Sequence, residues 1–253
     1  GTSYTLHGGP GAGKTTVLAD VQYHLQKNYP NAKIACVQSE MKKLDINYEY
    51  LINKMDWMGD LNYIILKDYG YENIKQVLLK IFKGGYDVLF IDSFEDIIGK
   101  LIAFEDMTTK EASHFLLELM DMANEGANDT GVLTSIVAIQ QETKGGEFKG
   151  DNTIKHLTSG MLKVQKDQKG NRYLTFSKNR RCGTHVDKKL YFSLTTEKTI
   201  KYDTELFFEL EEQARFVNEE KEAMAARTKE FFNDFALKVD EGNQVLNEEE
   251  LEN

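Results

Sequence analysis

The clearest chemical signature lies near the start of the printed sequence. Gly8-Gly9-Pro10-Gly11-Ala12-Gly13-Lys14-Thr15 fits the spacing G-x-x-x-x-G-K-[ST] at every fixed position. Glycines let backbone N–H groups curl around a phosphate, because they carry no Cβ that would clash. Lys14 is placed to reach the β- and γ-phosphates of a nucleotide, and the Thr15 hydroxyl to ligate Mg²⁺. We therefore expect these residues, together with Thr16 in the helix that follows, to bind ATP and Mg²⁺.

A second candidate residue ends a strongly apolar segment. In Val88-Leu89-Phe90-Ile91-Asp92, four apolar residues are followed by an acid. An acid at the carboxyl end of a buried strand beside a phosphate loop is placed to hold the shell of Mg²⁺. Taken alone, Asp92 fits a helix N-cap or a loop acid better than a metal ligand. The phosphate loop upstream favours the metal role, so we predict that Thr15 and Asp92 share the metal.

The elements that must position these residues follow from hydrophobic periodicity. Strands and helices alternate through the first part of the chain, which predicts an α/β core with a largely parallel sheet. Three short strands and a hairpin turn then predict an antiparallel extension at one sheet edge. The predicted strands are 4–7, 33–38, 62–66, 87–92, 132–139, 161–165, 172–177 and 189–194. The predicted helices are 15–28, 44–54, 73–83 and 109–125, and the turn is 167–171.

Charge divides the chain into two parts. The 253 residues carry 31 Lys and Arg against 41 Asp and Glu, a formal net charge of −10. Residues 203–253 hold 16 acids and 5 bases, with helical spacing of their apolar residues. We expect an ATPase core over 1–202 and an acidic helical extension over 203–253. Within the core, residues 144–189 hold 12 bases and 4 acids. Such an excess can meet phosphates, although a solvated face is the ordinary interpretation.

Several classes of protein are excluded by what the sequence lacks. The two cysteines, Cys36 and Cys182, form no CxxC pair, which argues against a disulfide scaffold or a zinc ribbon. No apolar run approaches the length of a membrane span, and no signal peptide opens the sequence. The default is therefore a cytoplasmic protein without a membrane partner, of a bacterium or of a phage in its host. The isolated histidines, His7 among them, show no ligand spacing, which favours structural roles.

The order of these motifs resembles the RecA-type P-loop ATPases, in particular the RadA-like DNA repair ATPases and the DnaB-like replicative helicases. The resemblance covers about residues 3–194 and implies a RecA-like core. In that superfamily, the strand after the phosphate-loop helix leads to a glutamate that activates the attacking water. The match here is Glu40, in Ser39-Glu40-Met41. A glutamine at a later strand end senses the γ-phosphate. Gln141 matches it best, with Gln140 as the alternative register.

The same resemblance implies contacts with single-stranded DNA. The segment 142–159 corresponds to the second DNA-binding loop of the family and carries Lys144, Lys149, Lys155 and His156 among glycines. Flexible glycines with spaced lysines suit a loop that becomes ordered on a sugar-phosphate backbone. The first DNA-binding loop of the family would fall near residues 99–110.

A further implication of the resemblance is an active site shared between subunits. Lys178-Asn179-Arg180 resembles the Lys-Asn-Arg of RadA and the Lys-x-Arg of DnaB. In those proteins the cations reach the γ-phosphate on the neighbouring subunit, and an arginine fork suits the charge that develops there. Here Arg181-Cys182 replaces the aromatic residue that precedes the glycine of the RadA motif, so Arg181 is an alternative to Arg180.

The leading hypothesis is an oligomeric ATPase, a hexameric ring or filament, that binds single-stranded DNA. It would act in DNA replication, recombination or repair as a helicase or translocase. The same motifs also fit an ATP-dependent recombinase or strand-annealing protein. A hypothesis of another class is a KaiC-like signalling or scaffold ATPase that does not bind DNA. The acidic tail would recruit replication or recombination proteins, or compete with DNA, unless it is simply a solvated helix end.

Overall fold

The fold is known from a computed structural model. It describes residues 1–41, 61–142, 154–180, 185–195, 200–213, 215–216 and 219–229, with the backbone alone at 155 and 156. The chain divides into two compact units, Gly1–Asp203 and Thr204–Asn253. In the second unit, the described residues 204–213, 215–216 and 219–229 are helical. No described helix is both long and apolar enough to cross a membrane.

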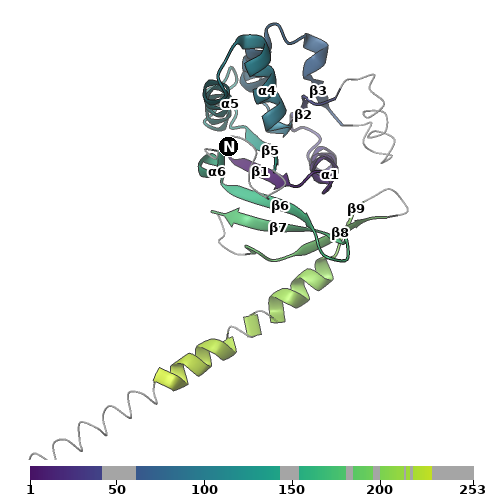
Figure 1. The fold of residues 1–253 in the computed structure, drawn as a ribbon, viewed down its shortest axis with the longest axis vertical. Helices are drawn as coiled ribbons and strands as arrows, with labels where there is room; N and C mark the ends of the chain where they lie inside the picture. Colours follow the sequence, from purple (N-terminus) through teal and green to yellow (C-terminus); the bar gives the residue numbers. More distant parts are fainter. Residues whose placement is uncertain are drawn as a thin grey trace, which may run out of the picture. The chain divides into compact units, whose positions relative to one another are not determined.

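The first unit is built on one mixed sheet (Figure 1). Its nine described strands lie in the order β3-β2-β4-β5-β1-β6-β7-β8-β9. The pairs from β3 to β6 are parallel, and those from β6 to β9 are antiparallel. The strands are β1 (Ser3–Gly8), β2 (Ile34–Gln38), β3 (Tyr63–Ile65), β4 (Val88–Asp92), β5 (Ser135–Gln141), β6 (Gly160–Lys166), β7 (Arg172–Asn179), β8 (Leu190–Leu194) and β9 (Ile200–Tyr202).

The helices cover both faces of the parallel part of this sheet, because successive side chains of a strand point to opposite faces. In β2, Val37 packs with α3, α4 and α5, whereas Cys36 belongs to the cluster that contains Val17 of α1. Strands buried on both faces read as continuous apolar runs, as the sequence predicted for 33–38 and 87–92. The helices are α1 (Lys14–Asn28), η2 (Leu66–Tyr69, a 3-10 turn), α3 (Ile74–Lys83), α4 (Phe94–Glu105), α5 (Thr109–Asn124) and α6 (Ile154–Leu157).

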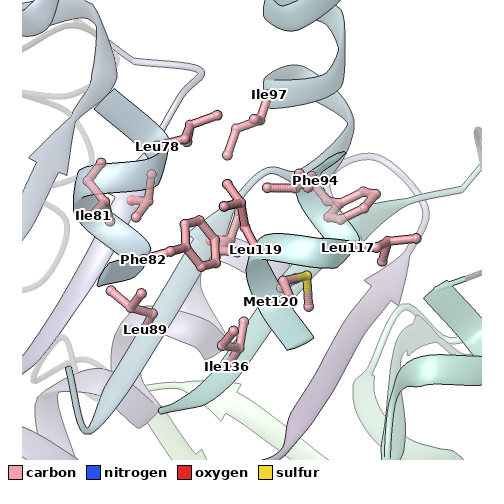
Figure 2. Packing of buried hydrophobic residues seen from close by; sticks show 14 of the residues in the cluster. Leu78, Ile81, Phe82, Leu89, Phe94, Ile97, Leu117, Leu119, Met120 and Ile136 are labelled. Atoms are coloured by element: carbon pink, nitrogen blue, oxygen red, sulfur yellow. The ribbon is translucent and has the colours of Figure 1, made fainter. Parts of the chain in front are cut away.

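The larger core cluster lies between three helices and the sheet. Figure 2 shows Phe82 of α3 and Leu119 of α5 meeting over Leu89 and Ile136, which belong to β4 and β5. Phe82 is completely buried. This packing fixes β4 and β5 against each other, and both strands end at residues of the candidate site.

The predicted α/β class with antiparallel strands at its C-terminal side is confirmed. Two details differ from the predictions. Strand β5 runs from Ser135 to Gln141 rather than over 132–139, so both Gln140 and Gln141 lie within it. Strand β6 is parallel to β1, so the antiparallel pairing begins only between β6 and β7. The predicted helix 44–54 lies outside the described residues.

The position predicted for the first DNA-binding loop is wrong. Residues 94–105 form α4, and α5 begins at Thr109, so only a short connection remains in the segment 99–110. The buried residues Ile97, Ile98 and Leu101 give α4 an apolar face at helical spacing. Two acids in its first turn, Glu95 and Asp96, are a further helix-start signal.

Candidate functional site

The phosphate loop connects β1 to α1, as the sequence predicted. At Gly8, where β1 ends, φ is 149°, and a Cβ there would lie 2.3 Å from the carbonyl oxygen of Val164 on β6. Gly13 caps α1 in the left-handed region with φ at 110°. Any other residue would strain the chain at both points, so glycine is required at each end of this turn. The loop thereby leads directly to a helix N-terminus, where backbone N–H groups bind anions.

Lys14 lies across its own loop. Its ammonium donates hydrogen bonds to the carbonyl oxygens of Gly8 at 2.8 Å and Gly9 at 3.1 Å. Burial lowers the pKa of Lys14, while the charges of Asp92 and Glu40 oppose that shift. A partly buried ammonium surrounded by loop carbonyls is well placed to exchange these contacts for phosphate oxygens.

Asp92 lies at the end of β4, where the sequence placed it. It is 3% exposed, and its pKa is raised to about 6 by burial and then by the charge of Glu40. Hydrogen bonds from Thr15 and Gln38 and the charge of Lys14 act in the opposite direction. The Gln38 amide donates to Asp92 Oδ2 at 3.3 Å. A cation bound beside this carboxylate would favour its ionised form.

The donor set at this point fits Mg²⁺. The Thr15 hydroxyl lies close enough to the Asp92 carboxylate to lower its pKa. Mg²⁺ is typically held by one or two such oxygen ligands together with water and substrate phosphates. Within the described ranges, no group of three or more His, Cys, Asp or Glu side chains could hold a metal by itself.

Glu40 and Gln141 are brought together from separate strands. Glu40 follows β2, and its Oε1 accepts hydrogen bonds from Gln141 Nε2 at 2.9 Å and Ser93 Oγ at 2.7 Å. The Glu40 backbone N–H also donates to Gln38 Oε1 at 3.1 Å. The neighbouring Gln140 is 1% exposed and points to the other side of β5. Of the two glutamines, Gln141 is therefore the one that faces Glu40.

Sequence reasoning missed the side chains that support these groups. Ser93 and Gln38 hold Glu40 and Asp92, and the peptide bond between Asp92 and Ser93 is cis. Gln38 ends an apolar strand, and an amide side chain in that position could have indicated a polar contact at the strand end. The side chain of Arg172 on β7 packs beside Gly13, with its Nε 3.8 Å from the position of a Cβ there. No sequence pattern pointed to that contact.

The candidate cations of the subunit interface lie on another part of the sheet. Lys178 is in β7 and Arg180 follows its end, while β1 and β6 separate β7 from β5. The pKa of Lys178 is lowered by burial and then by the charge of Arg180, so the two cations are close neighbours. Arg180 is exposed, and its backbone N–H donates to the Ser159 carbonyl at 2.9 Å. Arg181, the alternative, lies outside the described residues.

The predicted DNA-binding segment 142–159 is described only at its ends. Lys144 and Lys149 lie outside the described residues, and Lys155 and His156 lie in the short helix α6. Glu142 is buried against His7 and is not part of an exposed loop. Glu142 and residues 154–157 are therefore not part of a loop, and the DNA contacts of the segment stay a prediction.

Comparison with known proteins identifies a family of ATPases. The model of the family "ATPase family associated with various cellular activities (AAA)" matches residues 4–213. Among curated proteins, no significant match to the chain was found.

Solved structures of other proteins share the fold. The structure of a KaiC-like protein from the archaeon Pyrococcus horikoshii aligns with a TM-score of 0.57 and 22% identity, over 79% of this chain and 88% of that one. The flagellar accessory protein FlaH from Methanocaldococcus jannaschii aligns with a TM-score of 0.52 and 16% identity, over 80% of this chain and 89% of that one. At these identities the likeness concerns the fold alone.

Proposed function

Because the chain belongs to the AAA family of ATPases, we propose that it binds ATP with Mg²⁺ at the phosphate loop and hydrolyses it with Glu40 as general base. The observation that carries this proposal is the contact of Glu40 with Gln141 beside the phosphate loop, 2.9 Å between Oε1 and Nε2. Three strand ends thus supply a carboxylate, an amide and the metal-binding acid Asp92 to one region.

Each group has a part in the proposed reaction. The loop N–H groups and Lys14 hold the β- and γ-phosphates, and Thr15 and Asp92 would hold Mg²⁺. The metal, when bound, neutralises charge on the phosphate oxygens. Glu40 orients a water and accepts its proton as the water oxygen attacks the γ-phosphorus and the bond to the leaving ADP oxygen breaks. In the proposed reaction, the Gln141 amide, bonded here to Glu40, would exchange that partner for the γ-phosphate.

We also propose that the site is completed by a second copy of the chain. In the described structure, Lys178 and Arg180 lie at the far side of β6 from the phosphate loop. Two neighbouring cations at an exposed strand end suit the γ-phosphate of an adjoining subunit, where they would offset the charge of the transition state. A ring or filament is the assembly that such a head-to-tail contact builds.

The finer proposal is that turnover is coupled to single-stranded DNA. Its support is the excess of 12 bases over 4 acids in residues 144–189, which includes the glycine-rich segment after Gln141. A DNA-driven helicase or translocase, or a recombinase or strand-annealing protein, would use this segment to hold the sugar-phosphate backbone. The structural likeness to a KaiC-like protein favours a second candidate, a signalling or scaffold ATPase that does not use DNA.

Steady-state ATP hydrolysis tests both the roles of Lys14 and Glu40 and the coupling to single-stranded DNA. The full chain is assayed with Mg²⁺, with and without single-stranded DNA, beside Lys14→Ala and Glu40→Gln. We expect Lys14→Ala to lose hydrolysis and nucleotide binding. Glu40→Gln keeps the shape and the Ser93 contact but removes the base, so hydrolysis should fall about 10²- to 10⁴-fold while binding is retained.

The outcomes separate the candidates. Hydrolysis that DNA stimulates, and that Lys14→Ala abolishes, supports the DNA-coupled ATPase. ATP hydrolysis whose rate is unchanged by DNA at low salt supports the KaiC-like alternative, because contacts between a protein and DNA phosphates are strongest at low salt. Activity that survives in Glu40→Gln would contradict the assignment of the base.

A further inference from the structure

A polar network around the buried side chains of His7 and Glu142 lies next to the nucleotide site and takes no part in the reaction proposed above. His7 Nδ1 lies 2.6 Å from Glu142 Oε1, and His7 Nε2 lies 2.9 Å from Ser177 Oγ. The side chains of His7 and Glu142 are each 5% exposed. Lys163 Nζ lies 3.5 Å from the same carboxylate oxygen. We call His7, Glu142 and Ser177 the His7 network.

The sheet register brings the network together. His7 of β1 is paired with Gln140 of β5 on one side and with Lys163 of β6 on the other. Glu142 lies two residues beyond Gln140, so its side chain belongs on the same face of the sheet as His7. Gln141, between them, points to the opposite face, where it contacts Glu40. Two consecutive residues at the end of β5 thus contact the candidate base and the His7 network.

Ser177 reaches His7 because of an irregularity in β7. Met161 of β6 is paired with Lys178, but the next residue, Leu162, is paired with Phe176. Ser177 is therefore the extra residue of a β-bulge, and bulges redirect a side chain that a regular strand would point elsewhere. Its hydroxyl also lies 3.3 Å from the Met161 carbonyl oxygen, so it is held on both sides.

Each member of the network adjoins a residue of the proposed site. His7 precedes Gly8, the first residue of the phosphate loop, and Glu142 follows Gln141. Ser177 precedes Lys178, the first of the proposed interface cations. A buried carboxylate and imidazole must keep their partners, because an unpaired charge in the interior is strongly destabilising. A shift at any of these strand ends therefore has to be accommodated by the other two.

We infer that His7, Glu142 and Ser177 are positioning residues that couple the nucleotide bound in one subunit to the cations its own β7 presents to the next subunit. When Gln141 turns from Glu40 to the γ-phosphate, the end of β5 moves Glu142, and His7 transmits this change to Ser177 and Lys178. The inference rests on the proposed nucleotide site but does not require hydrolysis or DNA.

Hydrogen–deuterium exchange on the full chain tests the coupling. Peptides covering 172–180 are followed with and without Mg²⁺ and a non-hydrolysable ATP analogue. We expect the analogue to change exchange at 177–180 in the native protein. Ser177→Ala should lose about half or more of that change, because one hydrogen bond of the network is removed. Ser177 is exposed, so this variant should fold. Glu142→Gln should lose it too, and Ser177→Thr, which keeps the hydroxyl, should retain it.

A matched control separates coupling from general stability. Ser3 lies at the other end of β1 and accepts a hydrogen bond from Asn124 Nδ2 at 2.7 Å. Ser3→Ala removes a hydrogen bond of the same strand without touching the network, and its nucleotide response should equal that of the native protein. Where hydrolysis is measurable, Ser177→Ala should lower kcat about two- to tenfold, with KM for ATP changed less than about twofold.

The results distinguish two kinds of failure. If the native protein does not bind the analogue, the proposed function fails, and the coupling fails with it. If the analogue binds but exchange at 177–180 is unchanged, or changes equally in Ser177→Ala, the coupling alone is overturned. A loss of thermal stability in Ser177→Ala with an unaltered nucleotide response would give the network a purely structural role.

Discussion

At the scale of single residues, Asp92 is a site residue whose ionised form makes the folded protein less stable. Its carboxylate is buried beside Glu40, and its pKa is raised to about 6 from 3.8. A raised pKa in the folded state means that folding favours the protonated acid. The contribution of Asp92 to stability is thus full below the unfolded pKa of 3.8 and is lost as pH rises through about 6. Neutral pH is therefore unfavourable for this residue in the nucleotide-free protein.

Replacing Asp92 by asparagine should stabilise the nucleotide-free protein while abolishing Mg²⁺-dependent hydrolysis. The amide stays neutral at all pH values, so the gain in unfolding free energy should reach at most about 3 kcal/mol at about pH 7.5. It should shrink towards about pH 4.5, where the native acid becomes protonated. Denaturant titrations at both pH values measure this, with the exposed Asp129→Asn as the control. An equal gain at both pH values would contradict the electrostatic cause.

At the scale of elements, the site depends on the packing of helices against the strands that carry it. The completely buried Phe82 of α3 packs with α5 over β4 and β5. The ends of those two strands carry Asp92 and Gln141. The strand ends can hold Glu40 and the phosphate loop in place only if this cluster is well packed.

Truncating Phe82 tests this dependence. Phe82→Ala should lower the unfolding free energy by about 3–5 kcal/mol, because it removes a large apolar side chain and leaves a cavity. Tyr69→Ala is a suitable control, since Tyr69 is 63% exposed and should change stability by less than about 0.5 kcal/mol. Chemical denaturation of both variants gives the comparison. Similar losses for the two would show that the cluster does not determine the stability of the core.

At the scale of the whole molecule, the proposal of a shared site predicts complementation between inactive variants. Lys14→Ala lacks the phosphate-loop cation, and Arg180→Ala lacks the cation offered to the neighbour. In an equal mixture that exchanges subunits, about a quarter of the interfaces pair an intact loop with an intact Arg180. ATPase activity should therefore return to about a quarter of the native value.

The control for this mixture combines two variants whose changed residues both belong to the nucleotide-binding side of the site. Lys14→Ala mixed with Glu40→Gln can form no intact site at any interface, so its activity should stay at the level of the separate variants. Restoration in this control, or none in the first mixture, would argue that Arg180 does not act on a neighbouring subunit.

The sequence alone determined the parts of the molecule that depend on local pattern. The phosphate loop follows from residue types at fixed spacing, because glycines at strained positions and a lysine before Thr15 are required wherever this loop forms. Buried parallel strands follow from continuous apolar runs such as 33–38. The ends of β2 and β4 were predicted within a residue, which placed Glu40 and Asp92 at the correct edge of the sheet.

Only the tertiary structure decided which side chains meet across strands. The bulge that directs Ser177 to His7 depends on the register between β6 and β7, and register depends on packing and not on the pattern of one strand. His7 gave no signal because its partners, Glu142 and Ser177, are more than a hundred residues away in the sequence. Contacts of this kind arise when the sheet assembles. Local residue types therefore predicted the phosphate loop, whereas the pairing of strands in the sheet determined which surrounding side chains contact one another.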